Sequence, residues 1–121
     1  DVVVHLAALS NTGYCEQNPD ESYRVNVEGA ANIARGAALC GARMVFFSSD
    51  QVYNGNVESG LLNEDVTVAP ENVYGRHKLE AEERVLYFNP NSVVLRATWS
   101  SSSSARLKVN FVTGSNQLRR L

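Results

Sequence analysis

The sequence predicts an α/β fold built on a parallel β-sheet. Three observations support this: short apolar runs recur along the chain, segments with helical periodicity lie between them, and polar loops follow the runs. The order strand, helix, strand, helix, strand is a βαβ series, which gives a parallel sheet with right-handed crossovers. Ligands bind outside the carboxyl ends of the strands in such sheets, so the residues that follow each run are candidates for function.

The first apolar run, residues 1–8, is rich in valine and predicts a strand buried on both faces. It ends in Leu6, Ala7 and Ala8. The small alanines would let another group approach the backbone closely, as a ligand would. Packing of a helix against the alanines explains them equally well.

A long helix is predicted for residues 19–39, because alanines and aliphatic residues recur there near helical spacing. Gly41 suits its C-terminal stop. Asn26 lies inside this helix one turn from Gly29. That pairing indicates a tight helix contact or a structural polar bridge.

The chain continues with a predicted strand at residues 43–48, a long connection at 50–72, a helix at 73–87 and a strand at 92–97. The second helix has one apolar side. We expect its other side to face solvent with three acidic residues: Glu80, Glu82 and Glu83.

The last residues, 100–121, give weaker signals for secondary structure. The serine-rich segment 100–106 has no side chain to fill a core, so a flexible loop is expected there. Apolar residues recur between residues 107 and 121 at positions that favour a further helix, although Gly114 weakens that prediction.

The bulk composition limits the classes of function. The 121 residues suffice for one domain. A net charge of −2 gives no electrostatic case for nucleic acid or an anionic membrane. Cys15 and Cys40 have no metal-type spacing, which favours reduced thiols, a cytoplasmic location and no metal site. No apolar window is long enough to span a membrane, and the first residues lack the features of a signal peptide.

Three polar residues could converge on one chemical site. Ser49 follows the second predicted strand, and Tyr74 and Lys78 are four residues apart, so they share one face of a helix. A nearby ammonium is expected to lower the pKa of the phenol, which could then exchange a proton with a carbonyl or alcohol. A surface tyrosine and lysine would explain this spacing alone; the strand ending in two serines upstream adds weight to the chemical reading.

The segments 48–55 and 70–79 together resemble the extended short-chain dehydrogenase/reductase superfamily, and most closely its dTDP-4-dehydrorhamnose reductase group. The likeness extends to residues 5–8, 26–29 and 94–96 and covers about the first 99 residues. It implies a Rossmann-type doubly wound parallel sheet, of which this chain would be the C-terminal portion of the NAD(P)-binding domain.

The resemblance also implies roles for the residues that match its motifs. Tyr74 would be the catalytic acid/base, Lys78 would bind the nicotinamide ribose, and Ser49 would bind the substrate oxygen. The cofactor would be NADP(H) or NAD(H), lined by Leu6, Ala7 and Ala8. Asn26 would be the structural helix asparagine of the family.

The implied reaction is NAD(P)H-dependent reduction of a 4-keto group on a nucleotide-linked deoxysugar, by a cytoplasmic enzyme for which a homodimer is conceivable. Gln51 cannot ionise, which disfavours a dehydratase because water elimination needs an extra acid and base. A sugar-nucleotide epimerase stays open. A non-catalytic binding homologue, like the regulatory subunit of methionine adenosyltransferase, also stays open.

The sequence lacks the Gly-rich turn on which this superfamily places the dinucleotide pyrophosphate. The two strands expected before residue 1 are also missing. We therefore expect a partial domain, 1–121, that is an internal fragment without the N-terminal Gly-rich βαβ unit. Alone, it is expected to bind dinucleotide poorly and to be inactive.

Overall fold

The computed structural model describes residues 1–53, 68–99, 107–112 and 118–120. In this part of the chain one sheet runs in the order β1 (Val2–His5), β2 (Arg43–Ser49), β3 (Val93–Trp99), β4 (Leu107–Val112) and β5 (Leu118–Arg120). The first three strands pair in parallel, with β2 in the middle. This confirms the predicted α/β class and the order of its three predicted strands.

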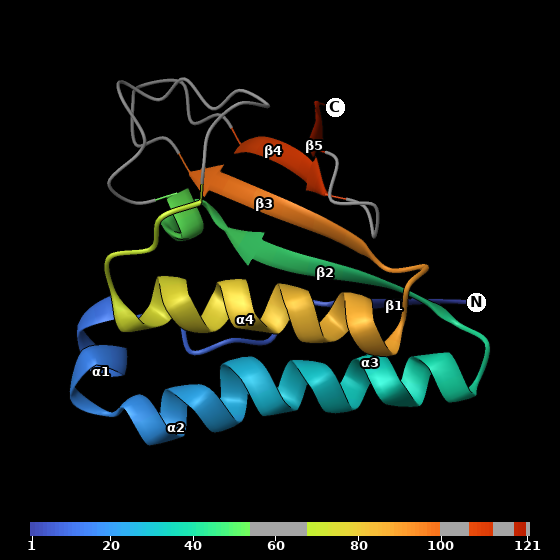
Figure 1. The fold of residues 1–121 in the computed structure, drawn as a ribbon, viewed down its shortest axis with the longest axis horizontal. Helices are drawn as coiled ribbons and strands as arrows, with labels where there is room; N and C mark the ends of the chain where they lie inside the picture. Colours follow the sequence, from blue (N-terminus) through green and yellow to red (C-terminus); the bar gives the residue numbers. More distant parts are fainter. Residues whose placement is uncertain (54–67, 100–106, 113–117, 121) are drawn as a thin grey trace.

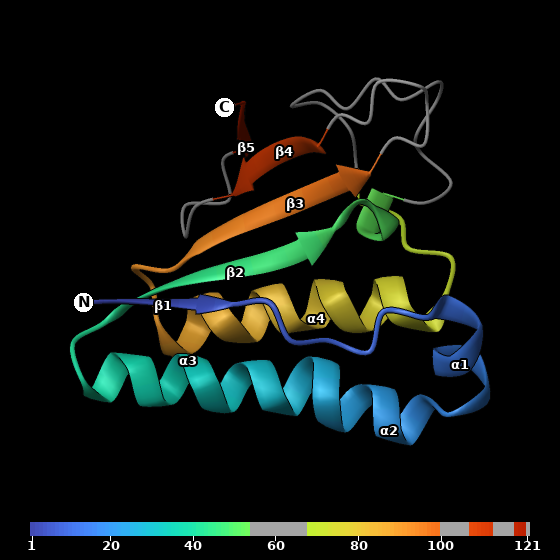
Figure 2. The same cartoon turned by 180° about the vertical axis from the view of Figure 1, so that it is seen from behind.

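Helices connect the successive parallel strands, as the βαβ prediction requires. A helical stretch connects β1 to β2 as α2 (Pro19–Tyr23), the π-helical η1 (Arg24–Glu28) and α3 (Gly29–Leu39), with a short α1 (Thr12–Gln17) before it. The 3-10 turn η2 (Asp50–Tyr53) and α4 (Val73–Phe88) connect β2 to β3. Figures 1 and 2 show α3 and α4 side by side on one face of the sheet. Both long helices were predicted.

The core lies between these two helices and the parallel strands. Small residues on α3, such as Ala30 and Ala34, let that helix approach the sheet closely, where they meet Met44 and Phe46 of β2 and Val85 of α4. Burial alternates along β2, so that its helix-facing side chains are buried and its other side chains are half-buried. Because α3 and α4 cover one face of the sheet, the strand residues turned toward that face are the more buried ones.

The predicted burial of the first strand on both faces is wrong for the described residues. Val2 and Val4 of β1 are 60% and 56% exposed, and Leu6, just after the strand, is 66% exposed. The physical reason is position: β1 is the first strand of the sheet order, and α3 and α4 cover only one face. Only the alternate side chains turned to that face are half-buried.

The helix predicted for residues 107–121 is also wrong. Residues 107–112 form β4, which pairs antiparallel with β3, and β5 pairs antiparallel with β4. The open edge of β3 offers backbone donors and acceptors that a strand can pair, and Leu107, Val109 and Phe111 alternate as a strand requires. The serine-rich segment 100–106 lies outside the described residues.

Candidate functional site

The structure brings Tyr74 into hydrogen-bonding contact with Ser49, and it brings Lys78 to the carbonyl of Phe47, two residues earlier in the same strand. Ser49 is the last residue of β2, at the carboxyl end of the parallel strands. Tyr74 and Lys78 lie on successive turns of α4, on the side turned toward the sheet, and are 8% and 3% exposed. The helix start packs against η2, which directly follows Ser49.

Several contacts fix the beginning of α4 against η2. Asn72 caps the helix, since its Oδ1 accepts from the Gly75 N–H at 2.7 Å, and its Nδ2 donates to Gln51 Oε1 at 2.9 Å. Glu16 of α1 accepts from the Val73 N–H at 2.6 Å. A Cβ on Gly75 would come within 2.6 Å of the Gln51 carbonyl oxygen. Only glycine therefore permits this approach, which places Tyr74 beside Ser49.

The Tyr74 phenol is perturbed in the direction opposite to the sequence prediction. Burial raises the pKa of Tyr74, and the nearby Asp50 carboxylate acts in the same direction, whereas hydrogen bonding by Ser49 lowers it. The predicted lowering by Lys78 fails because that ammonium is engaged elsewhere. The phenol is thus protonated at neutral pH.

The Lys78 ammonium points to the backbone of β2. Its Nζ donates to the Phe47 carbonyl at 2.8 Å and lies 4.3 Å from the centre of the Phe46 ring. Burial lowers the pKa of Lys78 to about 8, and the charge of Glu82 opposes that effect. An ammonium has three donors, so the bond to Phe47 leaves capacity for a ligand.

Ser49 is held by its own neighbours. Its Oγ accepts from the Gln51 N–H at 3.1 Å and lies 3.4 Å from Asp50 Oδ1, to which it donates. A hydroxyl has one donor and two acceptor positions, so Ser49 can bond to a ligand oxygen only if its O–H turns away from Asp50.

The residues predicted to line a cofactor occupy the carboxyl end of β1. Leu6 and Ala7 are exposed and Ala8 is half-buried, so this short segment offers an accessible apolar surface. The segment is anchored by Asn26, whose Oδ1 accepts from Leu9 N at 2.9 Å and whose Nδ2 donates to Leu9 O at 3.0 Å. Asn26 is 2% exposed and lies in the π-helical turn η1.

Sequence reasoning missed a buried polar network directly behind the site. Glu82 was predicted to face solvent, yet it is 3% exposed. Arg96 of β3 donates to both carboxylate oxygens, with Nη2–Oε1 at 2.8 Å and Nε–Oε2 at 3.2 Å. Ser48 Oγ donates to Oε2 at 3.0 Å, and Arg96 Nη1 donates to Tyr53 Oη at 2.8 Å.

The spacing on α4 could have revealed Glu82. It follows Lys78 by four residues and Tyr74 by eight, which puts all three on the same stripe of the helix as the buried Ala81 and Val85. The three glutamates were treated as one acidic group, although Glu82 alone shares that stripe.

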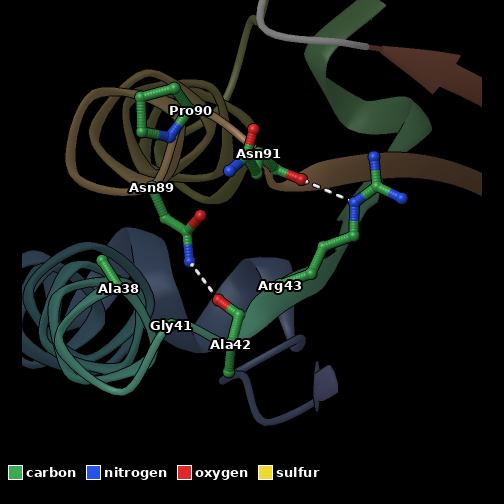
Figure 3. Close-up of a pocket in the computed structure, with 7 residues that line it drawn as sticks. All are labelled: Ala38, Gly41, Ala42, Arg43, Asn89, Pro90 and Asn91. Carbon is green, nitrogen blue, oxygen red and sulfur yellow. Dashed lines mark hydrogen bonds between the residues drawn. The ribbon is translucent and has the colours of Figure 1, made fainter. Parts of the chain in front are cut away.

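A separate open pocket lies at the other end of the parallel strands. It is lined by the end of α3, the start of β2 and the turn between α4 and β3, where Asn89 Nδ2 donates to the Ala42 carbonyl and Arg43 Nε to the Asn91 carbonyl (Figure 3). Gly41, with φ of 70°, makes the turn after α3. These bonds join structural elements, and the predicted site residues are all elsewhere.

Two features are absent from the described residues. None of their helices has the length and apolarity needed to cross a membrane. Within the same ranges, no three histidine, cysteine, aspartate or glutamate side chains gather as metal ligands.

Comparison with known proteins gives consistent matches. A family model described as RmlD substrate binding domain matches residues 1–119. The dTDP-4-dehydrorhamnose reductase of Sinorhizobium fredii is 38% identical over 112 residues, which are 93% of this chain and 36% of that protein. Methionine adenosyltransferase 2 subunit beta of Bos taurus is 37% identical over 112 residues, 93% of this chain and 33% of that protein.

Solved structures agree on the fold. The dTDP-4-dehydrorhamnose reductase of Bacillus anthracis, in complex with NADP, superposes with a TM-score of 0.75 and 31% identity, covering 81% of this chain and 35% of that one. The likeness confirms the Rossmann-type class of the sheet. The chain spans about a third of the length of the proteins it matches.

Proposed function

The chain belongs to the RmlD substrate binding domain family, and on that premise we propose that its protein reduces the 4-keto group of a nucleotide-linked deoxysugar with NADPH or NADH. The observation that carries this proposal is the convergence of Ser49, Tyr74 and Lys78 at the carboxyl end of β2. The names of the matched reductases support the substrate class.

The residues at this edge fit the nicotinamide end of such a cofactor. Leu6 and Ala7 offer accessible apolar surface, and Lys78 carries free donors for ribose hydroxyls. The Nε2 atom of His5, in the same strand end, is buried without a hydrogen-bond partner. When bound, the reduced nicotinamide supplies the hydride that the carbonyl carbon of the sugar receives.

The protein's own groups complete the reaction. The Ser49 hydroxyl has one proton, which it would turn from Asp50 Oδ1 to the carbonyl oxygen, and this bond would orient the substrate. Tyr74 Oη donates its proton to that oxygen, so the carbonyl becomes an alcohol once the carbon has received the hydride. Since burial raises the pKa of Tyr74, the phenol is in the protonated form that reduction requires. Lys78, whose ammonium bonds to the Phe47 carbonyl two residues before Ser49, would bind the nicotinamide ribose.

The replacement Tyr74→Phe in the full-length protein tests the proposal. We expect the rate of NADPH oxidation with a 4-keto sugar nucleotide to fall by about 10²–10⁴-fold, because the proton donor is lost. Tyr87→Phe is a matched control: Tyr87 lies on the same helix and is 79% exposed, so turnover should not change. Unchanged turnover in Tyr74→Phe would contradict the proposal.

A second candidate is a non-catalytic subunit that binds a partner protein. The match to methionine adenosyltransferase 2 subunit beta favours it, because the identity is almost equal to that of the reductase. This candidate predicts no turnover with either nicotinamide cofactor, and a stoichiometric complex recovered by pull-down. An active wild-type protein that recovers no such partner would exclude it.

A further inference from the structure

We propose that Glu82 is a positioning residue, which keeps the Lys78 side chain charged and directed at the carboxyl end of β2. The site roles on which this rests are those of the proposed reductase. Glu82 itself touches neither Ser49 nor Tyr74 through any contact described above; it acts through Lys78 and through the strand that carries Ser49.

First, the positions of Lys78 and Glu82 on α4 connect both side chains to β2. Lys78 and Glu82 lie four residues apart on the buried stripe of α4, and their partners on β2 are adjacent residues. Lys78 Nζ donates to the Phe47 carbonyl at 2.8 Å, while Glu82 accepts from Ser48 Oγ at 3.0 Å. The two side chains therefore connect α4 to the last residues of β2, immediately before Ser49.

The second step is the rigidity of Glu82. Arg96 donates to both of its oxygens and is itself held by Tyr53 of η2, at 2.8 Å. In the sheet Arg96 is the register partner of Ser48, so the carboxylate is held from β2 and β3 at once. A side chain with three fixed donors keeps a single position, and its charge stays at a constant distance from Lys78.

The third step is electrostatic. Lys78 is 3% exposed, and burial disfavours its charged form. Glu82 opposes this and raises the pKa of Lys78. Burial in turn raises the pKa of Glu82, but Arg96 and Ser48 oppose the rise by donating to the carboxylate. We take Glu82 as ionised because Arg96, which stays protonated in proteins, donates to both of its oxygens, and an ionised carboxylate accepts at both.

Within the described ranges of the chain, Glu82 is the acidic group that raises the pKa of Lys78. His5 of β1 and Lys78 repel each other, which helps to lower the pKa of that imidazole. Arg96 is positive and stands behind Glu82, while Tyr53 of η2 bonds to Arg96. Nearer the helix start, the acidic Asp50 acts on the Tyr74 phenol.

The test measures the pKa of Lys78 directly. Lys78 and Lys108 are the two lysines of the printed sequence, and NMR of ¹⁵N-lysine-labelled full-length protein follows the amine against pH, with Lys78→Met for assignment. In Glu82→Gln we expect the pKa of Lys78 to fall by about one unit or more. Glu80→Gln is the matched control. It makes the same chemical change on the exposed side of α4, and the Lys78 pKa should not move.

The same variants move the pH profile of activity. If Lys78 must be charged, kcat/KM of the wild-type protein falls as the pH rises through about 8, the pKa of this lysine. In Glu82→Gln the fall should begin at lower pH by the same shift, and Glu80→Gln should keep the wild-type profile. A loss of structure alone would lower activity at every pH without displacing the profile.

Each result of these measurements either supports or overturns the role of Glu82. An unchanged Lys78 pKa in folded Glu82→Gln would overturn the inference. If the wild-type protein shows no turnover but the Lys78 pKa falls in Glu82→Gln, the reductase proposal fails while the electrostatic role of Glu82 stands. Should Glu82→Gln fail to fold, the double variant Glu82→Gln, Arg96→Gln removes both buried charges, and the pKa of Lys78 should still fall, by less than in Glu82→Gln because Arg96 no longer repels the ammonium; an unchanged pKa there would overturn the inference.

Discussion

Two Glu–Arg pairs involve the same helix and differ in almost every physical respect. Glu80 and Arg84, four residues apart on the outer side of α4, approach to 3.4 Å with side chains 39% and 44% exposed. Glu82 and Arg96 approach to 2.8 Å with side chains 3% and 7% exposed. The outer pair is a typical helix-surface ion pair. The inner pair connects the helix to β2, β3 and η2 behind the candidate site.

The difference shows how burial changes the effect of a charged pair on its surroundings. Water screens the outer pair, so it adds little to stability and perturbs little around it. The inner pair has lost its water, so each charge depends on the other and acts on Lys78 nearby. One helix thus carries a solvated face and a face that sets the electrostatics of a site.

The largest effect is expected from breaking the inner pair. Arg96→Met leaves the Glu82 carboxylate buried without its cation, and we expect the free energy of unfolding to fall by about 3–5 kcal/mol. Urea denaturation measures this. Adding Glu82→Leu to the same protein should recover most of the loss, because the buried carboxylate that lost its cation is then removed as well. A loss below about 1 kcal/mol would mean that Glu82 is not ionised or not truly buried.

An intermediate effect is expected at the contact that sets the inner face of α4 in place. In Gly75→Ala the new Cβ meets the Gln51 carbonyl oxygen at 2.6 Å, so η2 and the helix must separate. We expect a loss of about 1–3 kcal/mol in stability, together with lower turnover, since Tyr74 moves relative to Ser49. Gly36→Ala is the control, because a Cβ there meets nothing within 4 Å. Equal effects of the two replacements would show that the contact is not tight.

The smallest effect is expected from the outer pair. Arg84→Met removes an exposed i,i+4 partner of Glu80 and a donor to the Tyr23 hydroxyl. We expect a change of about 0.5 kcal/mol or less in the free energy of unfolding, which moderate salt should reduce further. A loss as large as that of Arg96→Met would remove the distinction between the two pairs.

The sequence predicted the parts of this fold that depend on local pattern. The parallel strands, both long helices and the stop at Gly41 follow from apolar periodicity and turn residues. Burial of the first strand and a helix at the chain end were predicted wrongly, because both depend on neighbours in space: β1 has one covered face, and β4 pairs with the open edge of β3. Periodicity cannot report on such neighbours.

The features of the candidate site could likewise be predicted from the sequence only in part. Ser49, Tyr74 and Lys78 were named from motif and spacing. The environment of Tyr74 and the role of Glu82 were not, because the pKa of a phenol and the exposure of a glutamate depend on tertiary burial. Arg96 lies in the segment 94–96 that carries the family resemblance, but its burial could not be predicted, since an arginine at the end of an apolar run normally reaches solvent.

The most direct test of the account compares one residue from each face of α4. The kcat/KM for NADPH-dependent reduction of a 4-keto sugar nucleotide is measured for Lys78→Met and for Arg84→Met in the full-length protein. Both replacements remove one positive charge from the same helix and keep a long apolar side chain. The account predicts a loss of about 100-fold or more in Lys78→Met and wild-type activity in Arg84→Met. Equal activity in the two variants would contradict it.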